Sequence, residues 1–492
     1  MNTAFLAATL SVVTLSSSLG ANAQVATPDQ SATRIERSLP LMLATPGHEG
    51  DRATLEARMR FYGVPGLSVA VIHDGKVVWA RAYGLADVAA RTPMTTSTLF
   101  EAGSVSKSVA AVAAMRLVQD GKLPLDTNVA GVLRSWKLPA NTLTASSQVT
   151  LVRLLSHSAG VNVHGFNGYD AGKPVPTLLQ VLDGQPPANS EAIRVVAAPG
   201  AGFVYSGGGY TIVQQMIEDV AGSSFASYAM RQVLKPLQMN SSAYDQPLAP
   251  ERRSRAASAY RTGGAPVEGR FHTYPEQAAA GLWSTPSDLA RFVIGLEDAF
   301  AGRSTQVIDR ATALSMISPE HRVKLNGPDD TYWGLGFELG AFGNPDTFSH
   351  DGVDEGFDTT MLGFAHGRDG VVIMANANNT FLLQRELISA IAQEYGWKPF
   401  HPGKQRTYVP WAKEELSGYP GRYADTDGTT VSIAARNDRL VVEDSGECYE
   451  MYKAPDGRVF VPGEFVGELA PQKMDGSRIV GFNGERDSLR RL

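Results

Sequence analysis

Residues 105–118 are apolar around nearly their whole circumference when they are read as a helix. Valine, alanine, methionine and leucine recur at positions that face every direction, and a helix with this pattern is buried on most of its sides. Gly121 then ends the helix, because glycine readily adopts the left-handed conformation of a C-terminal cap. The segment is therefore expected in the interior of a large core. A chain of 492 residues can supply one, since this length corresponds to about two to four domains.

The composition is that of a globular, slightly acidic protein. Hydrophobic residues make up 43% of the chain and charged residues 19%, which excludes a disordered or fibrous chain. The net charge of −6 argues against nucleic acid as the main partner, because phosphate binding favours a basic surface. The single cysteine, Cys448, excludes an intrachain disulfide and a metal site built from cysteines. We interpret it as a buried apolar residue.

The N-terminal residues resemble a secretory signal. An apolar run over residues 5–15 is followed by Ala21, Asn22 and Ala23, and small residues at 21 and 23 fit a signal-peptidase site. We expect residues 1–23 to be removed and the mature protein to be secreted or periplasmic; the alternatives are a membrane anchor or an error in the start site. No other segment has the roughly 18 consecutive apolar residues that a membrane span requires.

The character of the chain changes near residue 400. Residues 401–415 are predicted to be a linker, and from residue 416 turn signals such as Asp427-Gly428 recur between short β-rich runs. Regular short strands with tight turns predict a small all-β, barrel-like domain over residues 416–492. Residues 24–400 would then form the main domain.

The main domain is predicted to be α+β. Residues 67–72 and 77–80 form a predicted hairpin with an Asp-Gly turn, and residues 357–364 and 371–375 form a second one. A further helix covers residues 210–220. Early and late strands can share one antiparallel sheet with helices packed against it.

The apolar helix begins with a pair of residues that can carry chemistry. Ser104 and Lys107 are three residues apart, so both side chains lie on one face of the helix. A serine hydroxyl becomes a good nucleophile when a base takes its proton. A lysine can be that base if burial and the positive end of the helix dipole lower its pKa.

Two later segments offer partners for this pair. Tyr205 precedes the second helix, and a phenol there can share a proton with Lys107. His350 and Gly352 precede the strand that begins near Phe357, and a small residue at a strand edge lets a substrate lie along the backbone. Taken singly, Tyr205 is better explained as a packed tyrosine and His350 as a loop histidine.

Together, the three segments resemble the serine β-lactamase-like hydrolases, which include class C β-lactamases, D-alanyl-D-alanine carboxypeptidases, D-aminopeptidases and related esterases. Four further segments look like those of the family: residues 154–160, 236–239, 281–289 and 333–337. The resemblance implies an antiparallel sheet flanked by helices, with the serine at the start of a central helix.

The resemblance also implies roles for single residues. Ser104 would be the acylated nucleophile, Lys107 its proton acceptor and Tyr205 a proton relay. His350 would hold the first position of the third motif, and Gly352 would keep the strand edge open. The backbone N–H groups of Ser104 and Val353 would form the oxyanion hole. His157 is expected to be structural.

The chain departs from the β-lactamase pattern in two places. Class C β-lactamases usually carry Tyr-x-Asn, but the third position is Gly207 here, and their Lys-Thr-Gly is replaced by His350-Asp351-Gly352. A histidine is only partly charged near neutral pH, so the site lacks the permanent positive charge that a lysine would offer to a substrate carboxylate. Residues 162–187 have no helix or strand pattern; they either rim the site or form a long loop.

The leading hypothesis is a secreted serine hydrolase that acts on a small-molecule or peptide substrate, by cleaving a peptide bond, perhaps beside a D-residue, or an ester. The alternatives are a catalytically silent peptide- or peptidoglycan-binding protein and a weak β-lactamase. We expect no cofactor and no metal, because the sequence has no His-Glu-x-x-His, P-loop or dinucleotide motif. The oligomeric state stays open.

Overall fold

The computed structural model describes residues 27–325, 330–401, 403–424, 430–436, 438–444, 447–457, 459–461, 478–480 and 488–491. The predicted signal segment, residues 1–23, lies outside them. The helices are α1 (Pro28–Arg37), α2 (Leu55–Tyr62), α3 (Val105–Gln119), α4 (Thr142–Ser146), α5 (Leu151–Leu155), α6 (Leu178–Asp183), α7 (Gly207–Ala221), α8 (Phe225–Ala229), α9 (Pro250–Arg253), α10 (Gln277–Ala280), α11 (Pro286–Phe300), α12 (Arg310–Met316), α13 (Phe381–Tyr395) and α14 (Lys413–Gly418).

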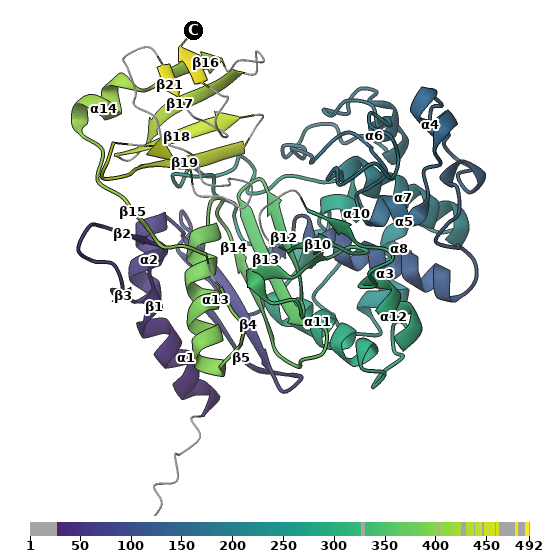
Figure 1. Cartoon of the computed structure of the whole chain (residues 1–492), viewed down its shortest axis with the longest axis horizontal. Helices are drawn as coiled ribbons and strands as arrows, with labels where there is room; N and C mark the ends of the chain where they lie inside the picture. The colour runs from purple at the N-terminus through teal and green to yellow at the C-terminus, as the bar shows by residue number, and fades with distance from the viewer. Residues whose placement is uncertain are drawn as a thin grey trace, which may run out of the picture.

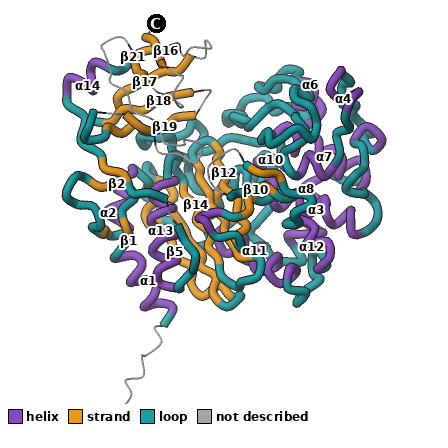
Figure 2. The backbone as a smooth tube through the Cα atoms, viewed as in Figure 1, coloured by secondary structure: helices purple, strands orange, loops and turns teal. Residues whose placement is uncertain are grey.

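An antiparallel sheet of nine strands forms the centre of the described chain (Figure 1, Figure 2). Its order is β6-β5-β4-β14-β13-β12-β11-β10-β9, so the first hairpin of the sequence pairs with the last one. The strands are β4 (Gly66–His73), β5 (Lys76–Asp87), β6 (Thr92–Pro93), β9 (Val323–Lys324), β10 (Tyr332–Trp333), β11 (Glu338–Leu339), β12 (Thr347–Asp354), β13 (Phe357–Phe364) and β14 (Gly370–Ala375).

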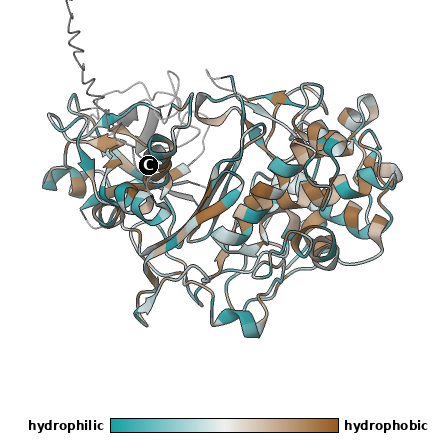
Figure 3. Cartoon of the chain, turned by 90° about the horizontal axis from the view of Figure 1, so that it is seen from below, coloured by the Kyte–Doolittle hydropathy of each residue, from teal (hydrophilic) through white to brown (hydrophobic). Residues whose placement is uncertain are grey.

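Both faces of this sheet are covered. Alternate residues of β4 and β14, such as Val69 and Ile373, pack with α1, α2 and α13 in one cluster. Their neighbours, such as Ala70 and Met374, pack with α11 and α3 in another. The strands are therefore continuously apolar, as expected when both faces of a sheet are buried. Figure 3 shows the hydrophobic residues gathered on these strands and on the helices beside them.

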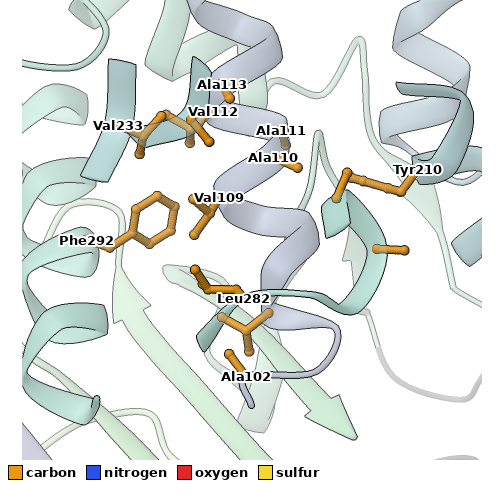
Figure 4. Close-up of a cluster of buried hydrophobic side chains, with 14 of the residues drawn as sticks. Ala102, Val109, Ala110, Ala111, Val112, Ala113, Tyr210, Val233, Leu282 and Phe292 are labelled. Atoms are coloured by element: carbon orange, nitrogen blue, oxygen red, sulfur yellow. The ribbon is translucent and has the colours of Figure 1, made fainter. Parts of the chain in front are cut away.

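Helix α3 runs through the middle of the helical region. It is buried from Val105 to Met115, and Val109 and Val112 lie close to Phe292 and Val233 of neighbouring helices (Figure 4). The pattern that predicted an interior helix is thus matched by packing on every side. Asp120 caps the helix, and Gly121 follows with a φ of +69°.

The remaining coarse predictions agree closely with the elements. The predicted strand over residues 357–364 coincides with β13, and the predicted helix over 210–220 is α7, which begins three residues earlier, at Gly207. The prediction of a segment without helix or strand over residues 162–187 is wrong in part, because α6 lies inside it. The Thr177–Gln180 capping box and Gly184 in the left-handed conformation hold this short helix.

A second antiparallel sheet contains the strands after residue 420, with the order β20-β19-β18-β17-β16-β22-β21. Its all-β character agrees with the prediction, while the domain boundaries stay a prediction. The predicted linker is not purely irregular, because it contains a two-residue strand and the start of α14. The strands are β16 (Gly421–Ala424), β17 (Thr430–Arg436), β18 (Arg439–Asp444), β19 (Glu447–Lys453), β20 (Val459–Phe460), β21 (Arg478–Val480) and β22 (Ser488–Arg491). Cys448 belongs to β19, but its side chain lies outside the described part.

Three two-stranded sheets accompany the two larger ones in the described residues. The pairs are β1 (Leu39–Pro40) with β3 (Arg52–Ala53), β2 (Leu43–Ala44) with β15 (Arg406–Thr407), and β7 (Phe100–Glu101) with β8 (Trp283–Ser284). Across the residues described, none of the helices is long and apolar enough to cross a membrane.

A buried ion pair ties α2 to α13. Arg58 donates to both carboxylate oxygens of Glu386 at 2.8 Å, and Tyr62 Oη donates to the same carboxylate at 3.0 Å. The side chains of Arg58 and Glu386 are 8% and 0% exposed. A buried charge that loses its partner is strongly destabilising.

We expect Glu386→Ala to lower the free energy of unfolding by about 3–5 kcal/mol, because Arg58 would keep a buried, uncompensated charge. Urea unfolding measures the change. The matched control is Glu56→Ala, which removes the exposed partner of Arg60 on the same helix and should cost no more than about 1 kcal/mol. Equal effects of the two variants would contradict the argument.

Candidate active site

Ser104 is held where the loop before α3 lies against β12. It occupies the N-cap position of α3, and Gly103 before it has a φ of +51°. A Cβ on Gly103 would lie 2.6 Å from Val353 N, and a Cβ on Gly352 would lie 2.1 Å from Ala102 O. Neither position can accept a side chain without moving backbone, so the two glycines bring the serine to the edge of the sheet.

Lys107 contacts the serine directly. Its Nζ lies 2.8 Å from Ser104 Oγ and donates a second hydrogen bond to Ala279 O at 2.8 Å. The residue is 2% exposed. Burial lowers the pKa of Lys107 to about 7, while the charge of Asp354 acts in the opposite direction. Near neutral pH a large share of the amine is therefore uncharged and can accept the proton of the serine.

Tyr205 lies beside this pair, as the resemblance implied. It precedes α7, and the Lys107 Nζ is 5.1 Å from the centre of its ring. The ring packs on His157 with centroids 4.2 Å apart and meets Trp333 edge-on at 5.5 Å. These aromatic neighbours hold the phenol next to the amine.

His157 supports the tyrosine, in keeping with its predicted structural role. It is buried, and its Nδ1 accepts a hydrogen bond from Ser206 N at 3.0 Å. Burial, followed by the charges of Lys107 and His350, holds the pKa of His157 well below its usual range, so the ring is neutral. It fixes the backbone directly after Tyr205.

His350 lies on β12 and is 3% exposed. Its Nδ1 donates to Asp351 O at 2.6 Å, and its ring meets Trp333 at 5.0 Å and Tyr205 at 6.4 Å. Burial and the nearby charge of Lys107 lower the pKa of His350 to about 3. The expectation of a partly charged imidazole near neutral pH is therefore corrected: the ring is uncharged, because it lies in the interior beside another cation.

The edge of β12 is open next to the serine. Within the part of the sheet that the structure describes, β11 pairs only with Phe348 and Ser349, so the strand from His350 onward has no partner on that side. Gly352 lies close to Ser104 N, and Val353 is 53% exposed. This arrangement suits an oxyanion hole made by the N–H groups of Ser104 and Val353, whose role stays a prediction.

Three buried carboxyl groups behind the serine were not predicted from the sequence. Asp354 accepts a hydrogen bond from the backbone of Gly103, and burial raises the pKa of its carboxyl well above the usual value. Burial does the same for Glu101 and raises the pKa of Glu276 to about 8. The three groups come from separate segments and show no shared pattern in the sequence.

His164 was also not predicted from the sequence as a site residue. Its ring lies 4.8 Å from that of Tyr205. In the described residues no group of three or more His, Cys, Asp and Glu side chains is arranged to hold a metal ion. Ser104, the amine of Lys107, the phenol of Tyr205 and the nearby backbone N–H groups form a set suited to acyl transfer.

Comparisons with known proteins show a family match and similar folds. The family model described as Beta-lactamase matches residues 52–394. Penicillin-binding protein 4* of Bacillus subtilis (strain 168) is 25% identical over 436 residues, which cover 83% of this chain and 89% of that protein.

Two solved structures share the fold. The octameric penicillin-binding protein homologue from Pyrococcus abyssi has a TM-score of 0.60 and 24% identity, covering 88% of this chain and 94% of that one. SurE with D-Leu has a TM-score of 0.55 and 24% identity, covering 89% and 97%. The family match and the shared fold confirm the predicted fold class and the predicted resemblance.

The lowered pKa of Lys107 predicts how the reactivity of Ser104 depends on pH. Only the neutral amine accepts a proton, so the rate of Ser104 labelling by a fluorophosphonate should rise as the pH passes through about 7 and then level off. An ordinary lysine would place this rise near pH 10. His350→Gln should leave the rise in place, because His350 is uncharged throughout this range. A midpoint near 10 would contradict the assignment.

The close approach at Gly352 predicts a second result. Gly352→Ala places a methyl group against Ala102 O and should push β12 away from the serine. We expect the labelling rate to fall at least about tenfold and the free energy of unfolding to fall by about 1–3 kcal/mol. The control is Gly131→Ala, where a Cβ meets nothing within 4 Å. Unchanged labelling in Gly352→Ala would rule out a tight contact between the two backbones.

Proposed function

The chain belongs to the beta-lactamase family, and on this premise we propose that it is a serine hydrolase that forms an acyl-enzyme at Ser104. The observation that carries the proposal is the 2.8 Å contact between the hydroxyl of Ser104 and the buried amine of Lys107. An amine whose pKa is lowered to about 7 is a base matched to physiological pH.

Acylation begins when Ser104 Oγ attacks a substrate carbonyl and its proton passes to Lys107 Nζ. The carbonyl oxygen becomes an oxyanion, which the N–H groups of Ser104 and Val353 stabilise. The bond to the leaving group then breaks, and the leaving group takes a proton from Lys107 through the phenol of Tyr205. Water attacks the resulting ester and gives a proton to Lys107 through Tyr205. Lys107 returns a proton to Ser104 Oγ, which releases the acid and the free serine.

The substrate is best described as a peptide, with a D-residue, or an ester. The neutral His350 gives the site no permanent cation for a carboxylate, and Gly207 has no side chain to hold an amide. Both features disfavour β-lactam turnover. A solved relative of the fold is described with D-Leu, which supports testing D-aminoacyl substrates first.

The place of action that we propose is outside the cytoplasm. The proposal rests on the leader predicted over residues 1–23. Determination of the N-terminal residue of the protein exported by its host tests it: Gln24 is expected, and an N-terminal Met would contradict it.

Labelling with a fluorophosphonate tests the proposed reaction. The folded protein should react once, at Ser104, and Ser104→Ala should not react. Lys107→Ala should keep the fold and lose most labelling. Ser108→Ala is the matched control, because Ser108 lies on the same helix but donates to Gly336 O. Absence of labelling in folded protein would favour the alternative of a silent binding protein.

Side-by-side rates on four substrates then define the reaction. They are a p-nitrophenyl ester, a chromogenic cephalosporin, a D-aminoacyl amide and a D-Ala-D-Ala peptide. We expect turnover of the ester or of one of the D-substrates to exceed that of the cephalosporin. The reverse order would identify a β-lactamase.

A further inference from the structure

Helix α7, which follows Tyr205, begins with glycines, and residues 162–166 occupy the space that side chains at Gly207 and Gly208 would need. A Cβ on Gly207 would lie 3.0 Å from the ring of Phe166 and 3.1 Å from His164 O. A Cβ on Gly208 would lie 2.8 Å from Asn162 O. The segment of residues 162–166 therefore occupies the position where a side chain at the third place of the tyrosine motif would stand.

This segment is fixed in place by the start of α7. Gly207 N donates to His164 O at 2.9 Å, and Gly208 N donates to Val163 O at 3.0 Å. Ser206 Oγ donates to Asn162 O at 2.7 Å. Val163 has a φ of +59°, which is costly for a β-branched residue and persists only where the surroundings enforce it. The chain thus uses the first N–H groups of α7 to hold residues 162–166 against Tyr205.

The side chain that this segment brings to the site is His164. Its ring lies 4.8 Å from the ring of Tyr205, with 41° between the planes, and the residue as a whole is exposed to solvent. Partial burial, followed by the charge of Lys107, lowers the pKa of His164. A neutral imidazole carries one N–H donor and one acceptor. An exposed polar group next to the phenol is in a position to meet the substrate.

We propose that His164 binds the acyl portion of the substrate through a hydrogen bond, and that it replaces the side chain that Gly207 lacks. This inference rests on the proposed function, since it assigns a contact in the acyl-enzyme reaction. The favoured substrates are then acyl groups that carry an amide next to the reacting carbonyl, such as N-acylated aminoacyl esters. His164 acts as a specificity-determining residue, and Lys107 and Tyr205 keep their proton-transfer roles.

Two variants and two kinds of substrate test the inference. His164→Phe keeps a ring against Tyr205 and removes the hydrogen bond; His164→Gln restores a polar group. The substrates are p-nitrophenyl butyrate, which has no amide, and the faster of the p-nitrophenyl esters of N-acetyl-D-alanine and N-acetyl-L-alanine. His164→Phe should lower kcat/KM about tenfold on the amide-bearing ester and leave that on butyrate within about twofold. His164→Gln should recover most of the loss.

The controls separate this inference from the proposed function. Fluorophosphonate labelling of Ser104 should be unchanged in His164→Phe. If the unsubstituted protein is not labelled at Ser104, the proposed function itself has failed. His48→Phe, which changes an exposed histidine between β2 and β3, should alter neither rate. Equal loss on both esters, or loss without recovery in His164→Gln, would show a purely structural role, and no loss at all would remove His164 from the substrate site.

Discussion

The contact between a buried amine and a serine hydroxyl is the interaction on which this structure depends. A large share of Lys107 is uncharged near neutral pH because α3 is enclosed by apolar residues on every side. The same enclosure raises the pKa of the Asp354 carboxyl well above its usual value. An interior that disfavours charge increases the share of the neutral amine, which is the form that can take a proton from Ser104. The apolar core around the helix is therefore a condition for the chemistry as well as for the fold.

A second constraint is the close approach of two backbones. The loop before α3 and the open edge of β12 touch where Gly103 and Gly352 lack side chains. Because the amine fixes the hydroxyl and the glycines fix the backbone, the proposed nucleophile and the N–H groups of Ser104 and Val353 are positioned by separate elements. Such preorganisation is what electrostatic stabilisation of an oxyanion requires.

The sequence predicted those parts of the molecule that local patterns determine. The strand over residues 357–364 and the pair Ser104 and Lys107 follow from hydrophobic runs and helical spacing. The uncharged state of His350 could not be predicted, because it depends on burial beside Lys107 by distant elements. The position of His164 next to Tyr205 likewise depends on hydrogen bonds between segments that are 40 residues or more apart in the chain.

Recognition in this site has to rely on neutral groups. Among the described residues, the surroundings of Ser104 offer aromatic rings from Tyr205 and Trp333, uncharged imidazoles and the edge of β12 beyond its pairing with β11. An extended acyl chain can add to that edge through backbone hydrogen bonds, since strand addition needs no charged side chain. In the proposed mechanism a protonated Lys107 could attract a substrate carboxylate, but its protonation would remove the base that Ser104 needs. The proposed mechanism would therefore favour substrates whose reacting end is uncharged, because any group that binds by drawing a proton onto Lys107 also removes the base.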